Sequence, residues 1–106
     1  MANPYAGEVA LVINARREVM KLTLGALAEL EAALEADSLI GLVNRFEDGA
    51  FSSRDVAALI VAGLRGAGAD VSADDLMTAD IEGGPVAAAR AAAELLVRAF
   101  ALPGEA

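Results

Sequence analysis

The spacing of apolar residues changes near the start of the chain, from the period of a strand to the period of a helix. Apolar residues alternate with other residues over 8–13, and the alternation resumes over 17–23 after a polar break. From Leu24 onwards the spacing becomes three and four. Side chains alternate between the faces of a strand but return to one helix face every three or four residues. The pattern therefore predicts an antiparallel β-hairpin, Glu8 to Ile13 and Arg17 to Thr23, that leads directly into a helix.

The hairpin needs support from outside itself. Its turn, from Asn14 to Arg16, lacks the glycine that favours the common two-residue turns. A two-stranded hairpin alone is marginally stable in water. We therefore expect it to pack against helices or against a sheet of another subunit.

The remaining chain predicts four or five short helices. Thr23, Ser38, Ser52 and Ser72 are suitable N-cap residues, and the last two are followed three positions later by an aspartate, as in a capping box. The predicted helices span 24–36, 39–46, 53–65, a short segment from Ser72 to about Asp80, and 85–101. The fold class is α+β and mostly helical. We expect a flexible lead-in at 1–7, a single compact domain at 8–102 and a loose C-terminus at 103–106.

The last predicted helix is amphipathic. Arg90, Glu94 and Arg98 are four residues apart and share one face. Its predicted packing stripe consists of Val86, Ala89, Ala93, Leu96, Val97 and Phe100. Three charges near the middle of this segment are costly in lipid, so the pattern predicts no membrane span.

Composition excludes several kinds of chemistry. The 106 residues include no cysteine and no histidine, which excludes disulfides, zinc sites of the usual kind and catalysis that needs an imidazole base. The net charge of −8 argues against binding to nucleic acid or to an anionic membrane, and it is compatible with a basic protein partner. The basic cluster of Arg16, Arg17 and Lys21 is interpreted as facing carboxylates, with nucleic acid as the alternative.

Two further patterns fail as ligand sites. Asp70, Ser72 and Asp74 have the spacing of a calcium loop, but the glycine and the final acid of that loop are missing. Gly63, Gly66 and Gly68 follow a predicted helix, whereas a phosphate-binding loop precedes one. They are interpreted as a helix stop and a tight turn. We expect no cofactor, no metal and no enzymatic activity.

We expect the protein to act through apolar surfaces. The hairpin carries backbone edges that can accept another strand, and the alanines of the last helix let a partner helix approach closely. Ordinary packing within the chain is the alternative at both surfaces. The residues predicted to report partner binding are Val9, Leu11, Val19 and Lys21 in the hairpin, and Arg90 and Arg98 in the last helix.

Several stretches of the sequence also resemble one family. The stretches ANPYAGEVALVI, KLTLGALAELEAAL, LVNRFEDGAFSSRDVAALIVAGLRGAG and GGPVAAARAAAELLVRAF resemble the small tail protein of bacterial gene transfer agents, over about residues 2–100. That family is labelled a tail tube protein and is grouped with phage tail assembly chaperones.

The resemblance implies two roles. A tail assembly chaperone works in the bacterial cytoplasm, where it coats the tape measure protein and recruits tail tube subunits. A tail tube or minor tail component belongs to the finished particle. Tube subunits are built on two packed β-sheets, so the mostly helical pattern favours the chaperone. Either role implies protein partners, and association with further copies of itself is expected.

Overall fold

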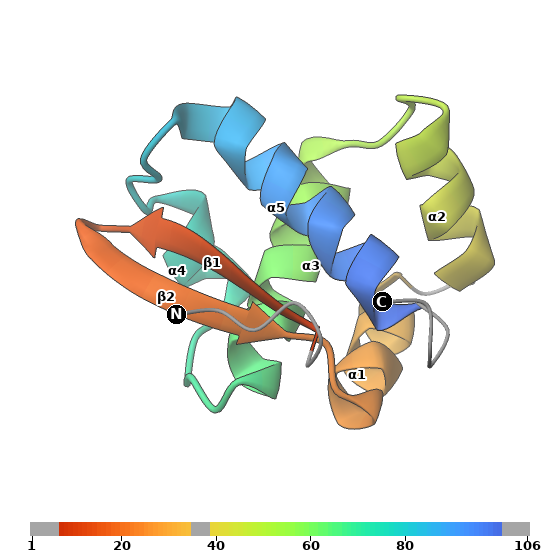
Figure 1. The fold of residues 1–106 in the computed structure, drawn as a ribbon, viewed down its shortest axis with the longest axis horizontal. Coiled ribbons are helices and arrows are strands. Elements are labelled where there is room, and N and C mark those ends of the chain that lie inside the picture. Colours follow the sequence, from red (N-terminus) through yellow and green to blue (C-terminus); the bar gives the residue numbers. More distant parts are fainter. Residues whose placement is uncertain (1–6, 35–38, 101–106) are drawn as a thin grey trace.

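The computed structural model describes residues 7–34 and 39–100, and its elements follow the predicted order (Figure 1). They are β1 (Glu8–Ile13), β2 (Arg16–Lys21), α1 (Leu24–Leu34), α2 (Leu39–Glu47), α3 (Ser53–Gly66), α4 (Ala73–Met77) and α5 (Gly84–Ala99). The prediction of a mostly helical α+β fold with an N-terminal hairpin is confirmed. The predicted lead-in before Gly7, the predicted end of the first helix at 36–38 and the predicted C-terminal segment at 103–106 lie outside the described residues.

The two strands are joined by a turn of only two residues. Glu8 pairs with Lys21 and Ile13 with Arg16, in an antiparallel register without a bulge. Asn14 and Ala15 have φ values of 52° and 65°. Positive φ at both central residues is the requirement of the type I′ turn, which matches the twist of the strands. The second strand therefore starts at Arg16, one residue earlier than the sequence predicts.

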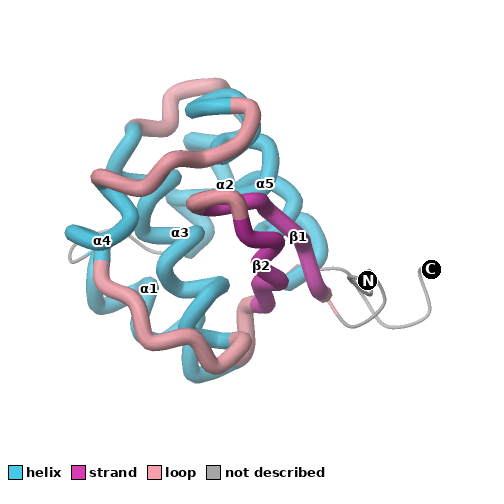
Figure 2. The backbone as a smooth tube through the Cα atoms, turned by 90° about the vertical axis from the view of Figure 1, so that its left-hand side faces the viewer, coloured by secondary structure: helices cyan, strands magenta, loops and turns pink. Residues whose placement is uncertain are grey.

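α3 is the central helix of the fold. It packs against α1, α4, α5 and β2, and the hairpin lies along one side of it (Figure 2). The inward face of the hairpin supplies Val9, Leu11 and Met20 to the same buried cluster as Leu59 of α3. The hairpin thus gains its support from helices of its own chain, which is one of the two alternatives that the sequence leaves open.

Two glycines of α3 allow its backbone to approach the hairpin. A Cβ atom at Gly66 would lie 2.0 Å from the carbonyl oxygen of Lys21. A Cβ atom at Gly63 would lie 2.9 Å from Leu95 Cδ1 and 3.0 Å from Met20 Cβ. Both residues are therefore close-packing positions. Gly66 is also the last residue of α3, as the predicted helix stop requires, whereas Gly63 lies inside the helix. Only Gly68, at φ 100° just after α3, serves the turn.

Three of the predicted helix starts are confirmed by their caps, and the fourth predicted cap, Ser38, lies outside the described residues. Thr23 Oγ1 accepts a hydrogen bond from the backbone N–H of Ala26 at 3.1 Å. Ser52 with Asp55, and Ser72 with Asp75, each form both bonds of a capping box. The short helix that Ser72 opens ends at Met77, before the predicted end.

The core side of α5 is not the predicted one. The buried residues of α5 are Ala88, Ala91, Ala92, Leu95 and Leu96. Of the predicted packing stripe, only Leu96 is buried, and Val86, Val97 and Phe100 are exposed. The small alanines let α5 approach α3 and β1 closely, with Leu95 and Leu96 in the core beside them, while Val86, Val97 and Phe100 point outward. The predicted close approach at the alanines therefore occurs within the chain.

Both ends of the outer edge of β1 form bonds within the chain. Near the turn, the backbone N–H of Glu82 donates a 3.0 Å hydrogen bond to the carbonyl oxygen of Val12. The backbone N–H of Asn14 donates a 2.7 Å hydrogen bond to the carbonyl oxygen of Asp80. At the other end, the guanidinium of Arg98 donates to the carbonyl of Glu8. A strand from another subunit would have to displace these bonds to extend along this edge.

Candidate functional site

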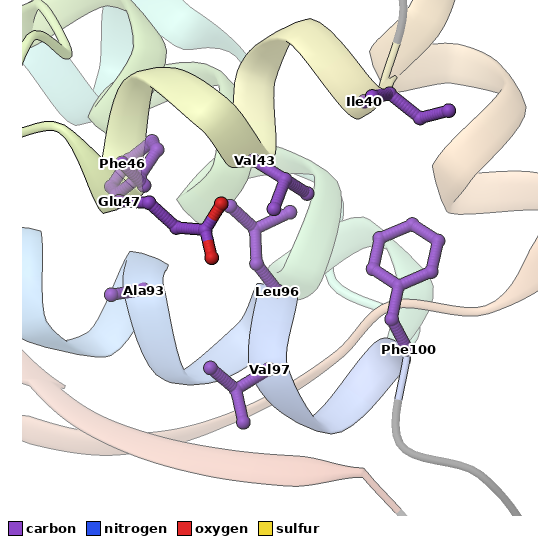
Figure 3. A pocket seen from close by; sticks show the side chains of 8 residues that line it. All are labelled: Ile40, Val43, Phe46, Glu47, Ala93, Leu96, Val97 and Phe100. Atoms are coloured by element: carbon purple, nitrogen blue, oxygen red, sulfur yellow. The ribbon is translucent and has the colours of Figure 1, made fainter.

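An apolar groove lies between α2 and α5. The two helices run in roughly opposite directions, with the groove between them (Figure 3). Its volume is about 440 Å³. Its walls consist of Ile40, Val43, Phe46 and Glu47 from α2, Ala93, Leu96 and Val97 from α5, and Phe100, the C-cap of α5. On each helix these positions recur at intervals of three and four, so each helix presents one continuous face to the groove.

Large apolar side chains remain exposed in this groove. Ile40 is 74% exposed, Val97 70% and Phe100 49%. The described residues contain six such exposed side chains, and these are three of them; the others are Leu24, Met77 and Val86. Exposed apolar side chains that gather in one place mark a binding surface more reliably than scattered ones do.

The groove stays open because α2 is held to the core along only one face. Leu42 is its single fully buried side chain. At its C-terminal end, the ring of Phe46 stacks on Phe51 with centroids 4.6 Å apart. Arg45 reaches α3, where Nε and Nη2 each donate a 3.0 Å hydrogen bond to the Asp55 carboxylate. These contacts fix α2 from one side and leave Ile40 and Val43 facing the groove.

The carboxylate of Asp55 is kept ionised by its partners. Burial raises the pKa of this carboxyl, but hydrogen bonds from Arg45 and from the backbone N–H of Ser52, together with the nearby guanidinium charge, outweigh burial. The net result is a pKa below the ordinary value of 3.8. The contact that positions α2 is therefore a charged one at neutral pH.

One charged side chain lines the groove. The carboxylate of Glu47 extends from the end of α2 into the space beside Leu96 (Figure 3). Within 7–34 and 39–100, no hydrogen bond or ion pair engages it. An occupant of the groove would thus meet apolar walls and one carboxylate at one end.

None of the six residues predicted to report partner binding lines the groove. Val9 and Leu11 are buried in the core, and Val19 and Lys21 are half-buried in β2. Arg98 forms an ion pair with Glu94, with Nη2 and Oε2 3.2 Å apart. It also donates to the carbonyl of Glu8 in β1, so it lies on the β1 side of α5. Arg90 is exposed and lies on the same face of α5 as Ala93 and Val97, which it precedes by three and seven residues. Their role in binding stays a prediction.

Sequence reasoning missed Ile40 and Glu47. The spacing of the sequence places Leu39, Leu42, Val43 and Phe46 on one face of this helix, and Ile40 falls beside that face. The apolar residues of this nine-residue helix cover more than one face, and that pattern could have indicated a second apolar surface at Ile40.

Comparison with protein families decides where this chain belongs. The family model described as "Phage tail tube protein, GTA-gp10" matches residues 6–102. The chain belongs to this family. It is therefore a tail protein of the kind found in gene transfer agents, as the sequence resemblance implies, and its role is structural or in tail assembly. No curated protein and no solved structure matches the chain.

The described part of this tail protein lacks two kinds of feature. No helix in it has the length and apolarity needed to cross a bilayer. It also contains no group of three or more acidic side chains placed to hold a metal ion. The α2–α5 groove is the surface on which a functional interpretation can rest.

Proposed function

We propose that this protein is a non-enzymatic tail assembly factor that acts in the bacterial cytoplasm. In this role it binds the tape measure protein of the gene transfer agent before the tail polymerises, and it then meets the tail tube subunits. The observation that carries the proposal is the open groove between α2 and α5, in which Ile40, Val97 and Phe100 remain exposed.

An acidic protein with an apolar groove suits this task. A long apolar helical partner aggregates when its apolar stripe faces water, and a groove can cover part of that stripe. The net charge of −8 keeps the resulting complex soluble and attracts basic segments.

The alternative is a structural component of the finished tail. The family description, which names a tail tube protein, favours it. The fold supports the assembly role, because the described residues contain a single two-stranded sheet. Tube walls of the kind implied by the family label need sheets that continue from one subunit to the next, and both ends of the β1 outer edge are already bonded within the chain.

Two measurements test the proposal. Co-expression of tape measure fragments with this protein should increase the soluble fraction of the fragments, and Val97→Asp should abolish that increase. Mass spectrometry of purified particles should find the protein at far below the abundance of tube subunits. Stoichiometric presence in particles, with no effect on tape measure solubility, would establish the structural role instead.

A further inference from the structure

We infer that the α2–α5 groove selects one amphipathic helix of another protein, and that Glu47 selects helices carrying a lysine or arginine at the border of their apolar face. The inference rests on the proposed function for the site and adds the chemistry of the partner.

The shape of the groove indicates a helix. α2 and α5 both present residues at helical spacing to the same space. The ridges of a third helix can pack between two such faces. An amphipathic helix that places residues i, i+3, i+4 and i+7 in an apolar groove is a common mode of recognition.

The carboxylate of Glu47 indicates the charge that the partner helix carries. Glu47 lines otherwise apolar walls, and no partner engages it within the described residues. A helix that covers the groove removes water from around this carboxylate, which is unfavourable unless a cation replaces the water. A lysine or arginine beside the partner's apolar stripe supplies it, and a glutamate there is repelled. The net charge of −8 steers the same kind of partner toward the protein.

The size of the groove favours a single helix over a second copy of this chain. Eight side chains line it. Stable protein dimers usually involve about 20–30 residues on each side. Two copies would also bring together two chains of charge −8. The observations therefore favour a foreign helix.

The test uses labelled helical peptides of about 20 residues, long enough to form a helix. One peptide has a leucine stripe bordered by a single lysine, and its twin has glutamate there. A second pair carries the same exchange on the far polar face, which controls for overall charge. Binding to the full chain is measured by fluorescence anisotropy. We expect about a twofold to fivefold preference for the border lysine, the range for a partly exposed ion pair, and a smaller preference in the control pair.

Charge reversal on the protein completes the test. Glu47→Lys should reverse the preference between the border peptides, while Asp48→Lys, an equal change of charge outside the groove, should keep it. Val97→Asp should weaken the binding of both peptides at least tenfold. Leu24→Asp, at an exposed apolar residue of α1, should leave their binding unchanged. An unchanged preference in Glu47→Lys would overturn the inference. So would a dimer in sedimentation that Val97→Asp dissociates, because the occupant would then be a second copy.

The failure of this inference is distinguishable from failure of the proposed function. If tape measure fragments are solubilised but Glu47→Lys has no effect on peptide preference, the function stands and the inference falls. If the peptides behave as expected but the protein is stoichiometric in particles and does not solubilise the tape measure, the inference stands and the assembly role falls.

Discussion

Arg45 of α2 and Asp55 of α3 form a two-point contact, with both hydrogen bonds at 3.0 Å. The same carboxylate accepts the backbone N–H of Ser52 at 2.9 Å and so closes the capping box of α3. One side chain therefore starts the central helix and also holds α2 in position. The pair is largely buried, since the side chains of Arg45 and Asp55 are 26% and 9% exposed.

We expect Asp55→Asn to lower the free energy of unfolding by about 1–3 kcal/mol, because it replaces the charge-assisted bonds from Arg45 to a mostly buried carboxylate with weaker ones. The measurement is urea unfolding followed by circular dichroism. Asp75→Asn is the matched control. Asp75 occupies the same capping-box position in α4, but it is exposed, so its loss should cost about 0.5 kcal/mol or less. Equal losses at the two sites would show that the Arg45 contact adds nothing beyond capping.

The Asp55 contact should also make stability depend on pH. The folded protein holds the pKa of this carboxyl below its ordinary value of 3.8. A carboxyl with a depressed pKa binds protons more readily in the unfolded state, so its contribution is present above pH 3.8 and is lost as pH falls through the folded pKa. Urea unfolding of the wild type and Asp55→Asn should therefore differ most at neutral pH and converge below pH 3.8. A difference that stays constant to the lowest pH tested would contradict this assignment.

The close approach of α3 to β2 predicts that Gly66 does not tolerate a side chain. In Gly66→Ala the new methyl group would lie 2.0 Å from a backbone oxygen of Lys21, which cannot rotate away. We expect a loss of about 2–3 kcal/mol in the free energy of unfolding, or repacking of the hairpin. Gly25→Ala in α1 is the control, because its methyl would meet nothing closer than Thr23 Oγ1 at 3.9 Å. That change should stabilise the protein by about 0.4–1 kcal/mol.

In the hairpin turn, a substitution should raise the free energy of unfolding. Ala15 is held at φ 65°, a left-handed conformation that an alanine adopts only at a cost. Ala15→Gly should raise the free energy of unfolding by about 0.5–1 kcal/mol, since glycine adopts positive φ without that cost. Ala15→Val, with a branched side chain, should lower it. Thermal unfolding of the two variants decides the point, and a stabilising effect of valine would exclude this account of the turn.

These examples show how far the sequence predicts the fold. The hairpin, the helices and both capping boxes depend on residues close together in the chain, such as Ser52 and Asp55, so spacing reveals them. The contact of Gly66 with Lys21, and that of Arg45 with Asp55, depend on how elements pack. Periodicity does not specify those contacts.

The groove illustrates the same limit. Because α5 carries apolar residues on more than one face, its spacing does not decide which face is buried. The small alanines take the core side, since they allow the closest approach to α3 and β1, and this leaves Val97 and Phe100 outside. The sequence therefore predicts the helix and a partner-binding surface on it, but it does not reveal the groove.

The last prediction concerns the function in producing cells. Val97→Asp places a charge on the wall of the groove at a residue that is 70% exposed, so we expect the protein to fold and to keep its stability. If the groove serves tail assembly, partner binding should weaken by at least about 1.4 kcal/mol, a tenfold change in Kd, and the yield of tailed particles should fall severalfold or more. The measurement is particle yield by electron microscopy and gene transfer frequency, at equal levels of soluble protein. Leu24→Asp, which puts the same charge on α1, should leave both unchanged. A normal yield with Val97→Asp would mean that tail assembly does not use this groove.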